Sequence, residues 1–273
     1  GEECKDPICL SRNRFGSQNS STYEASDTKF SVSYGTGACS GTLAHDTVSF
    51  AGLSFRMPFG VANTVSQDFG HFEIYGILGL SIAKSKTSSF IGSLIESKSL
   101  KRNMFGMSLS RTQDGINTGE INFGAPDTSK FTGDLKYYPL AGNGNEWVIE
   151  LVSAGFGETQ IPLVQNALLD TGTSYIFAPT EAAKKIYELI PGATTEDSGL
   201  TWQVPCDTKA DLVFKIGSDT YSIPSTGWVG KSAAGDKCHS HLGGTNLNNN
   251  DWVIGDFFLK NYYVVFDIDK RVI

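Results

Sequence analysis

The sequence predicts a mainly β protein with two lobes and a few short helices. Short apolar runs separated by Gly, Ser, Asn, Asp and Pro recur along the 273 residues. A hydrophobic motif containing glycine occurs once in each half, and the chain is long enough for two hydrophobic cores. Strands do not alternate regularly with helices, which excludes a doubly wound nucleotide-binding fold.

A β-hairpin is the first predicted element. Phe30, Val32 and Tyr34 alternate with polar residues before a glycine-containing tip at 35–37, and a second strand-like run follows at 43–50. Period-two alternation around a glycine tip is typical of a hairpin. Further strands are predicted at 119–124, 135–140, 147–152, 167–170, 212–216 and 262–267.

Two segments predict helices. Residues 90–95 carry apolar side chains at helical spacing behind a start rich in Ser and Thr. Residues 183–190 do the same between Pro179 and Pro191, and proline is common just before a helix and just after it.

The predicted lobes are 1–140 and 141–273, because the segment AGNGNE at 141–146 is the part of the chain most similar to a linker. The repeated motif supports this division: YGILGL at 75–80 is echoed by WVIGDFF at 252–258. Each copy is followed by an apolar run.

Charge and composition exclude several classes of protein. Twenty-two basic and 29 acidic residues give a net charge of −7, without the basic cluster of a nucleic-acid-binding protein. The sequence has no 18-residue apolar window, so we expect no membrane span. It also has no G-x-S-x-G motif and no glycine-rich dinucleotide loop, and no acidic pair stands out as it would in a glycosidase.

Five cysteines indicate an oxidising compartment. The simplest partition joins Cys4 to Cys9 and Cys206 to Cys238 and leaves Cys39 as a buried free thiol, although 15 pairings into two bridges exist. Metal ligation by CKDPIC at 4–9 or by the 238–241 segment is the alternative. No second CxxC-type pair supports it, so we expect neither a metal nor another cofactor.

A glycosylation sequon at Asn19 is compatible with a secretory route. Together with the cysteines, it leads us to expect a secreted protein, or one of a vacuolar or lysosomal-type acidic compartment.

The sharpest local signal is ALLDTGTS at 167–174. An apolar strand delivers the Asp170 carboxylate into a turn of glycine and hydroxyl residues, whose N–H and O–H groups can hold its oxygens. Aspartate is rare in strands and costly to bury without a partner. This pattern therefore indicates a catalytic carboxylate.

Four motifs in order, namely SVSYGTG, YGILGL, ALLDTGTSYIFAP and WVIGDFF, resemble the pepsin-like aspartic endopeptidases from about Ser20 onward. The resemblance implies a two-lobed acid protease fold with a central cleft. It implies Asp170 as a catalytic residue and Thr171 as its support. It also implies that Tyr34, Gly35 and Thr36 form a flap that contacts the substrate. Further substrate contacts are implied for Gly172, Thr173 and Ser174. Ile77 is assigned to the wall of a substrate pocket.

The corresponding chemistry needs two neighbouring carboxyl groups that share one proton, because both cannot ionise cheaply at close range. The ionised group activates a water molecule as general base, and the protonated group donates to the developing oxyanion. Peptide bonds would then be hydrolysed in acid, with a preference for bulky apolar side chains.

This interpretation lacks the second carboxylate, because we expect Asp170 to be the only aspartate of the sequence in a D-[TS]-G turn. Motif spacing predicts the first catalytic Asp before residue 1. Three explanations remain open: a separate N-terminal light chain or peptide, a truncation, and a pseudo-protease that binds peptides without cleaving them. With two lobes in one chain, we expect a monomeric unit that acts on peptide or protein substrates.

Overall fold

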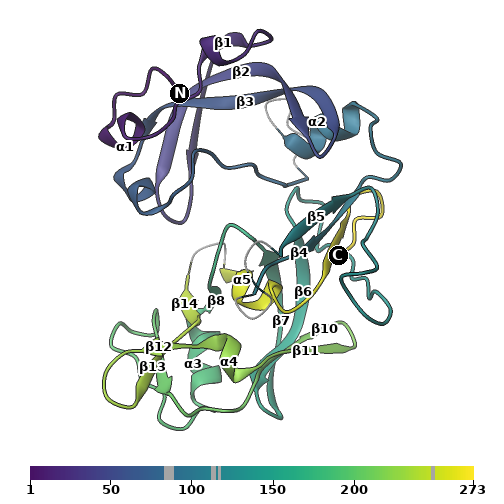
Figure 1. Ribbon diagram of the computed structural model, residues 1–273. Coiled ribbons are helices and arrows are strands. Elements are labelled where there is room, and N and C mark those ends of the chain that lie inside the picture. The colour runs from purple at the N-terminus through teal and green to yellow at the C-terminus, as the bar shows by residue number, and fades with distance from the viewer. Residues whose placement is uncertain (83–88, 112–114, 116–117, 247–249) are drawn as a thin grey trace. The chain divides into compact units, whose positions relative to one another are not determined.

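The computed structural model describes residues 1–82, 89–111, 115, 118–246 and 250–273. It contains two compact units, Gly1–Lys101 and Arg102–Ile273, shown in Figure 1. Both are built mainly from β-strands, which confirms the predicted class. Among the described helices, none has both the length and the apolar character needed to cross a membrane.

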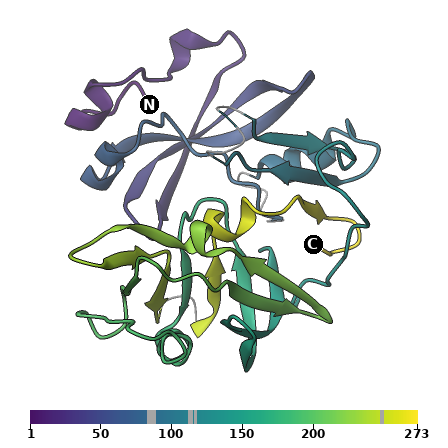
Figure 2. The same cartoon turned by 60° about the horizontal axis from the view of Figure 1, so that its bottom comes forward.

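The first unit is a three-stranded antiparallel sheet in the order β1-β2-β3, with β2 and β3 forming one long hairpin (Figure 2). Its elements are α1 (Pro7–Leu10), a 3₁₀ turn (Ser17–Asn19), β1 (Glu24–Ser33), β2 (Ala38–Phe50), β3 (Leu53–Val65), a second 3₁₀ turn (Gln67–His71) and α2 (Phe90–Glu96).

The predicted hairpin is confirmed as β1 and β2. Ser33 pairs with Ala38, and the N–H of Tyr34 donates to the carbonyl of Gly37 at 2.9 Å across the tip. Gly37 has a φ of +91°, a conformation that residues with a Cβ rarely adopt. The glycine at this position is therefore what allows the tight reversal.

Helix α2 confirms the prediction at 90–95 and lies against β3 (Figure 1). Phe90 is 2% exposed and packs its ring against Phe50 and Phe55, with centroids 5.3 and 5.6 Å away. Ser89 begins the helix, because its hydroxyl accepts a hydrogen bond from the N–H of Gly92 at 3.2 Å.

The second unit holds a seven-stranded sheet in the order β11-β10-β6-β7-β15-β8-β14 and two three-stranded sheets. Its strands are β4 (Met104–Ser108), β5 (Glu120–Phe123), β6 (Val148–Phe156), β7 (Thr159–Leu169), β8 (Ile176–Pro179), β9 (Gln203–Pro205), β10 (Leu212–Ile216), β11 (Asp219–Ile223), β12 (Val229–Ser232), β13 (Lys237–Ser240), β14 (Leu242–Thr245), β15 (Trp252–Ile254) and β16 (Val264–Asp267). Its helices are α3 (Thr180–Tyr187), α4 (Ser225–Trp228) and α5 (Asp256–Leu259).

The short strand β15 is central to this sheet. It pairs in parallel with β7, where Val253 is opposite Leu168, and antiparallel with β8, where Val253 is opposite Phe177. Trp252 and Ile254 are fully buried between these neighbours. Strands at 119–124, 147–152, 167–170, 212–216 and 262–267 were predicted and are present. Most boundaries differ by four residues or fewer, but β7 begins at Thr159, eight residues before the predicted start.

The strand predicted at 135–140 is wrong. Only an isolated bridge joins Pro139 to Val272, and the backbone of Tyr138 exchanges hydrogen bonds with Ile273. The segment thus contacts the last residues of the sequence through single bonds and does not extend into a ladder. Nearby, β4 pairs with β16, so residues 104–108 belong to the second unit; the lobe boundary at 140 stays a prediction.

The helix predicted at 183–190 is confirmed as α3, although it begins and ends three residues earlier. Tyr187 is buried and stacks on Trp202 with ring centroids 4.1 Å apart. Its hydroxyl donates to the Leu242 carbonyl at 2.5 Å. These contacts attach α3 to β14.

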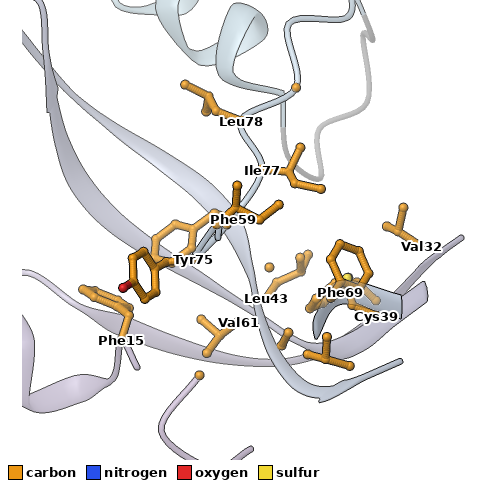
Figure 3. Close-up of a pocket in the computed structure, with 18 of the residues that line it drawn as sticks. Phe15, Val32, Cys39, Leu43, Phe59, Val61, Phe69, Tyr75, Ile77 and Leu78 are labelled. Atoms are coloured by element: carbon orange, nitrogen blue, oxygen red, sulfur yellow. The ribbon is translucent and has the colours of Figure 1, made fainter. Parts of the chain in front are cut away.

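Both expected disulfides are confirmed, one joining Cys4 to Cys9 and the other Cys206 to Cys238. Cys39 is free, as expected, but half-buried rather than buried. It lies on β2 and lines a hollow in the first unit (Figure 3).

Candidate active site

The carboxyl group of Asp170 lies in a tight turn directly after β7. Its Oδ1 accepts a hydrogen bond from the N–H of Gly172 at 2.8 Å, and its Oδ2 accepts one from the Thr173 hydroxyl at 2.7 Å. The N–H of Thr173 donates to the Asp170 carbonyl at 3.2 Å and closes the turn. These hydrogen bonds fix the orientation of both carboxylate oxygens, while Asp170 stays partly accessible to solvent.

Strand β15 and helix α5 hold this turn from the other side. The N–H of Asp170 donates to the Ile254 carbonyl at 3.1 Å, and the N–H of Asp256 donates to the Thr173 carbonyl at 2.8 Å. Gly255 lies between these bonds. A Cβ added to it would overlap the carbonyl oxygens of Thr173 and Tyr175, so only glycine fits beside the turn.

Asp256 is a second carboxyl group of this site that the sequence analysis did not single out. Burial, together with the negative charge of Asp170, raises the pKa of Asp256 from 3.8 to about 6, and the positive charge of Lys260 opposes the shift. Within the described residues, its Oδ1 is buried without a hydrogen-bond partner. The sequence feature that could have identified Asp256 is its position directly after Gly255, the glycine of the WVIGDFF motif.

The raised pKa of Asp256 predicts that Asp256→Asn stabilises the protein in neutral solution. Above pH 3.8 ionisation of this aspartate stabilises the unfolded chain, whereas in the folded protein the same carboxyl group stays protonated until about pH 6. The wild-type aspartate therefore lowers the unfolding free energy at neutral pH, and a neutral Asn removes this penalty. After allowance for solvent screening, we expect a gain of about 1–2 kcal/mol in unfolding free energy at pH 7 and almost none at pH 3.5. Urea denaturation at both pH values measures it.

Asp197→Asn is the matched control and should act in the opposite direction. Hydrogen bonds from the Thr201 hydroxyl and N–H lower the pKa of Asp197 to about 2. Its contribution is present above pH 3.8 and lost as the pH falls through 2, so Asn should destabilise the protein at pH 7. If Asp256→Asn and Asp197→Asn change the unfolding free energy at pH 7 in the same direction and by the same amount, the opposite pKa shifts of these two aspartates are contradicted.

Asp197-Ser198-Gly199 also has the D-[TS]-G pattern, which corrects the expectation that Asp170 is the only such aspartate. The two turns differ in structure. The carboxylate of Asp197 accepts hydrogen bonds from Thr195 and Thr201 in a surface loop, and no strand leads into it. This pattern alone therefore does not define the site.

The other predicted site residues lie in both units. Tyr34, Gly35 and Thr36 are exposed at the tip of the β1–β2 hairpin, and Ile77 is exposed in the first unit, outside any strand. Around Asp170, the residues Thr171, Gly172 and Ser174 are exposed and Thr173 is half-buried. Thr173 was predicted to contact substrate; here its hydroxyl holds Asp170.

The predicted alternatives for the cysteines can now be compared with the geometry. Cys4, Asp6 and Cys9 bring their ligand atoms within 4.8 Å of one another, but both sulfur atoms belong to the disulfide and are not available as thiolates. Asn19 is exposed at the end of a 3₁₀ turn, where its Oδ1 accepts a hydrogen bond from the N–H of Gly16.

Comparison with known proteins gives a consistent result. A family model described as eukaryotic aspartyl protease matches residues 1–273. The chain is 38% identical over 276 residues to a probable aspartic-type endopeptidase CTSD of Arthroderma benhamiae, covering 99% of this chain and 54% of the relative. The ctsD endopeptidase of Aspergillus fumigatus is also 38% identical, with 99% and 58% coverage. Pepsin A of Bos taurus is 31% identical over 277 residues, with 97% and 73% coverage.

The chain thus spans little more than half the length of the first two relatives and nearly three quarters of pepsin A. The family model nevertheless covers it from the first residue to the last. From this match and these identities, the chain belongs to the eukaryotic aspartyl protease family.

Proposed function

We propose that this protein is an aspartic endopeptidase, and that Asp170 works with a second aspartate that the 273 residues do not contain. The observation that carries this proposal is the turn after β7, where two donors from the same loop hold both oxygens of one partly accessible carboxyl group. The relatives are named aspartic-type endopeptidase and pepsin A, in agreement with this chemistry.

The held carboxyl group suits general acid–base catalysis. With a proton shared between Asp170 and its partner, the ionised carboxylate removes a proton from a water molecule, which attacks the peptide carbonyl. The protonated partner donates to the oxyanion that forms. The donors at Gly172 and Thr173 fix the orientation of Asp170, so little reorganisation is needed during the reaction.

Substrate contacts are proposed for exposed residues of both units. Tyr34, Gly35 and Thr36 would cover a bound peptide as a flap, and Gly172 and Ser174 would contact its backbone. Ile77, 53% exposed, offers an aliphatic surface for a bulky apolar side chain. Thr171 is assigned a supporting role beside Asp170.

The proposed setting is an acidic compartment outside the cytosol, reached by secretion or by a vacuolar or lysosomal route. Two disulfides and an exposed sequon at Asn19 agree with that setting. The working unit is proposed to be monomeric, with the second aspartate supplied by a separate light chain or by further residues of the same polypeptide.

The alternative is a pseudo-protease that binds peptides without cleaving them. A statine-type transition-state mimic separates the two functions. For the enzyme we expect it to block peptide hydrolysis in acid and to bind at least about 100-fold more tightly than a peptide of the same length. The measurement is inhibition together with calorimetric binding. Equal affinity for the mimic and the peptide, without hydrolysis, supports the pseudo-protease.

A further inference from the structure

Three aromatic rings lie against one another beside the loop that follows Asp170. His241 stacks on Phe257, with ring centroids 3.5 Å apart and planes 16° from parallel. Tyr175 lies edge-on to both rings, its centroid 5.6 Å from that of His241 and 5.5 Å from that of Phe257. The rings come from three separate parts of the second unit, namely this loop, the residue between β13 and β14, and helix α5 (Figure 1). The stack therefore joins segments that are distant in the sequence.

The same residues also hold the backbone of the loop after Asp170. The N–H of Phe257 donates to the Ser174 carbonyl at 2.9 Å, and the N–H of Ile176 donates to the His241 carbonyl at 3.0 Å. The loop carries the threonine hydroxyl that donates to the carboxyl group of Asp170. A change in the contact between His241 and Phe257 would therefore be transmitted to the orientation of Asp170.

The other face of the Phe257 ring is contacted by a cation. The ammonium nitrogen of Lys260 lies over the ring, 4.2 Å from its centroid. The nearly parallel imidazole of His241, 3.5 Å away, leaves no room for this nitrogen on its own face. The ring is thus enclosed between the two side chains. Protonation of His241 would place a second positive charge against a ring that already binds one.

The surroundings of His241 favour its neutral form. Nδ1 lies 3.2 Å from the Gly227 carbonyl, and because a carbonyl oxygen can only accept, Nδ1 carries the proton. Burial lowers the pKa of His241 below its ordinary value of 6.5; the hydrogen bond to Gly227 opposes the shift, and the positive charge of Lys260 adds to it.

The groups that face the imidazole come from every neighbouring element. Tyr175 of the loop and Lys260 after α5 are the titratable ones that contact it or act on it. Helix α4 and strand β12 approach it with the backbone of Gly227 and Gly230. A Cβ at Gly230 would lie 2.6 Å from Nε2, so the ring fills its site closely.

We propose that His241 is a positioning residue of the active site: its neutral ring, stacked on Phe257, holds the loop of Asp170, and its protonation loosens that loop. This inference rests on the proposed function, since it assigns an acid limit to hydrolysis by Asp170 and its partner. As the pH falls from 6.5 through the lowered pKa of His241, the unfolded chain takes up the proton first and the folded loop loses stability. The expected working range is therefore mild acid.

Hydrogen exchange in the full chain tests the proposal without turnover. The reporters are the amides of Ile176 and Phe257, which form the bonds to the loop. His241→Ala removes the ring and should speed their exchange at least about tenfold at pH 7. His241→Phe keeps a ring that cannot be protonated. Its amides should exchange at least about fivefold more slowly than those of the parent at a pH below the titration of His241. His239→Ala, an exposed histidine on β13, is the matched control and should change neither rate.

A second variant keeps the test independent of how well phenylalanine fits. Lys260→Gln removes the positive charge that lowers the pKa of His241, so this pKa should rise. The imidazole proton signals of His241 measure it by NMR. The pH at which Ile176 and Phe257 lose protection should rise together with it. The comparison of variants at the same pH cancels the intrinsic pH dependence of amide exchange.

Three results would overturn the inference: unchanged protection in His241→Ala, equal exchange of His241→Phe and the parent at every pH, or loss of protection at a pH unrelated to the His241 titration. If protection follows the titration in a preparation with both aspartates that hydrolyses nothing, the proposed function alone is refuted. In a hydrolytic preparation, kcat below the titration should be at least about threefold higher in His241→Phe than in the parent. A ratio of one there refutes the positioning role alone.

Discussion

Asp170→Asn is expected to reduce kcat for peptide hydrolysis at least about 10³-fold, the largest effect of any single substitution. Asparagine has nearly the same shape and can still accept from the N–H of Gly172, so the turn should survive. It cannot remove a proton from water, so the general base is lost. The measurement is cleavage of a peptide in acid by a preparation that contains both aspartates.

Asp197→Asn is the control for this prediction, since Asp197 is also followed by a hydroxyl residue and glycine. Its carboxylate is bound by threonines of its own loop, so kcat should remain within about twofold of the parent. The proposed site is refuted if Asp197→Asn abolishes hydrolysis while Asp170→Asn retains it. Asp197 would then be the catalytic residue in place of Asp170.

Gly255→Ala is expected to give the largest loss of stability. The new Cβ would overlap two carbonyl oxygens of the loop that follows Asp170, and backbone atoms cannot move aside as flexible side chains do. Overpacking typically costs about 1–3 kcal/mol, and we expect the upper end of that range here because the overlap is with backbone atoms. A displaced turn also misaligns Asp170, and a shift of about 1 Å costs roughly 100-fold in rate. Thermal unfolding and kcat together measure both effects.

Gly79→Ala supplies the matched control, because the same motif position in the first unit is open. We expect Gly79→Ala to change the unfolding free energy by at most about 0.5 kcal/mol. If Gly255→Ala unfolds at the same temperature as the parent, the close approach of the turn to Gly255 is contradicted.

Local patterns in the sequence predicted much of the fold and part of the site. The β1–β2 hairpin follows from alternation and a glycine tip, and the turn at Asp170 follows from an apolar strand that ends in small hydroxyl residues. Both depend on neighbours in the sequence, so the information is local. The predicted identities of the disulfides also hold.

What could not be predicted depends on distant partners. Residues 75–80 and 252–258 have similar sequences, yet only the second forms a strand, because a strand needs neighbours that pair with it. The environment of Asp256 is set by burial and by Asp170, a residue of the turn that follows β7. Likewise the failed strand at 135–140 reflects where the chain's last residues bind.

The pairing of β15 with β7 also determines when the site can assemble during synthesis. The sheet of the first unit joins strands that are consecutive in sequence, so it can form as the chain emerges from the ribosome. The N–H of Asp170, however, binds a carbonyl of Ile254, which is translated much later. A nascent chain therefore leaves the Asp170 turn without this support until residue 254 has been added, 84 residues after Asp170.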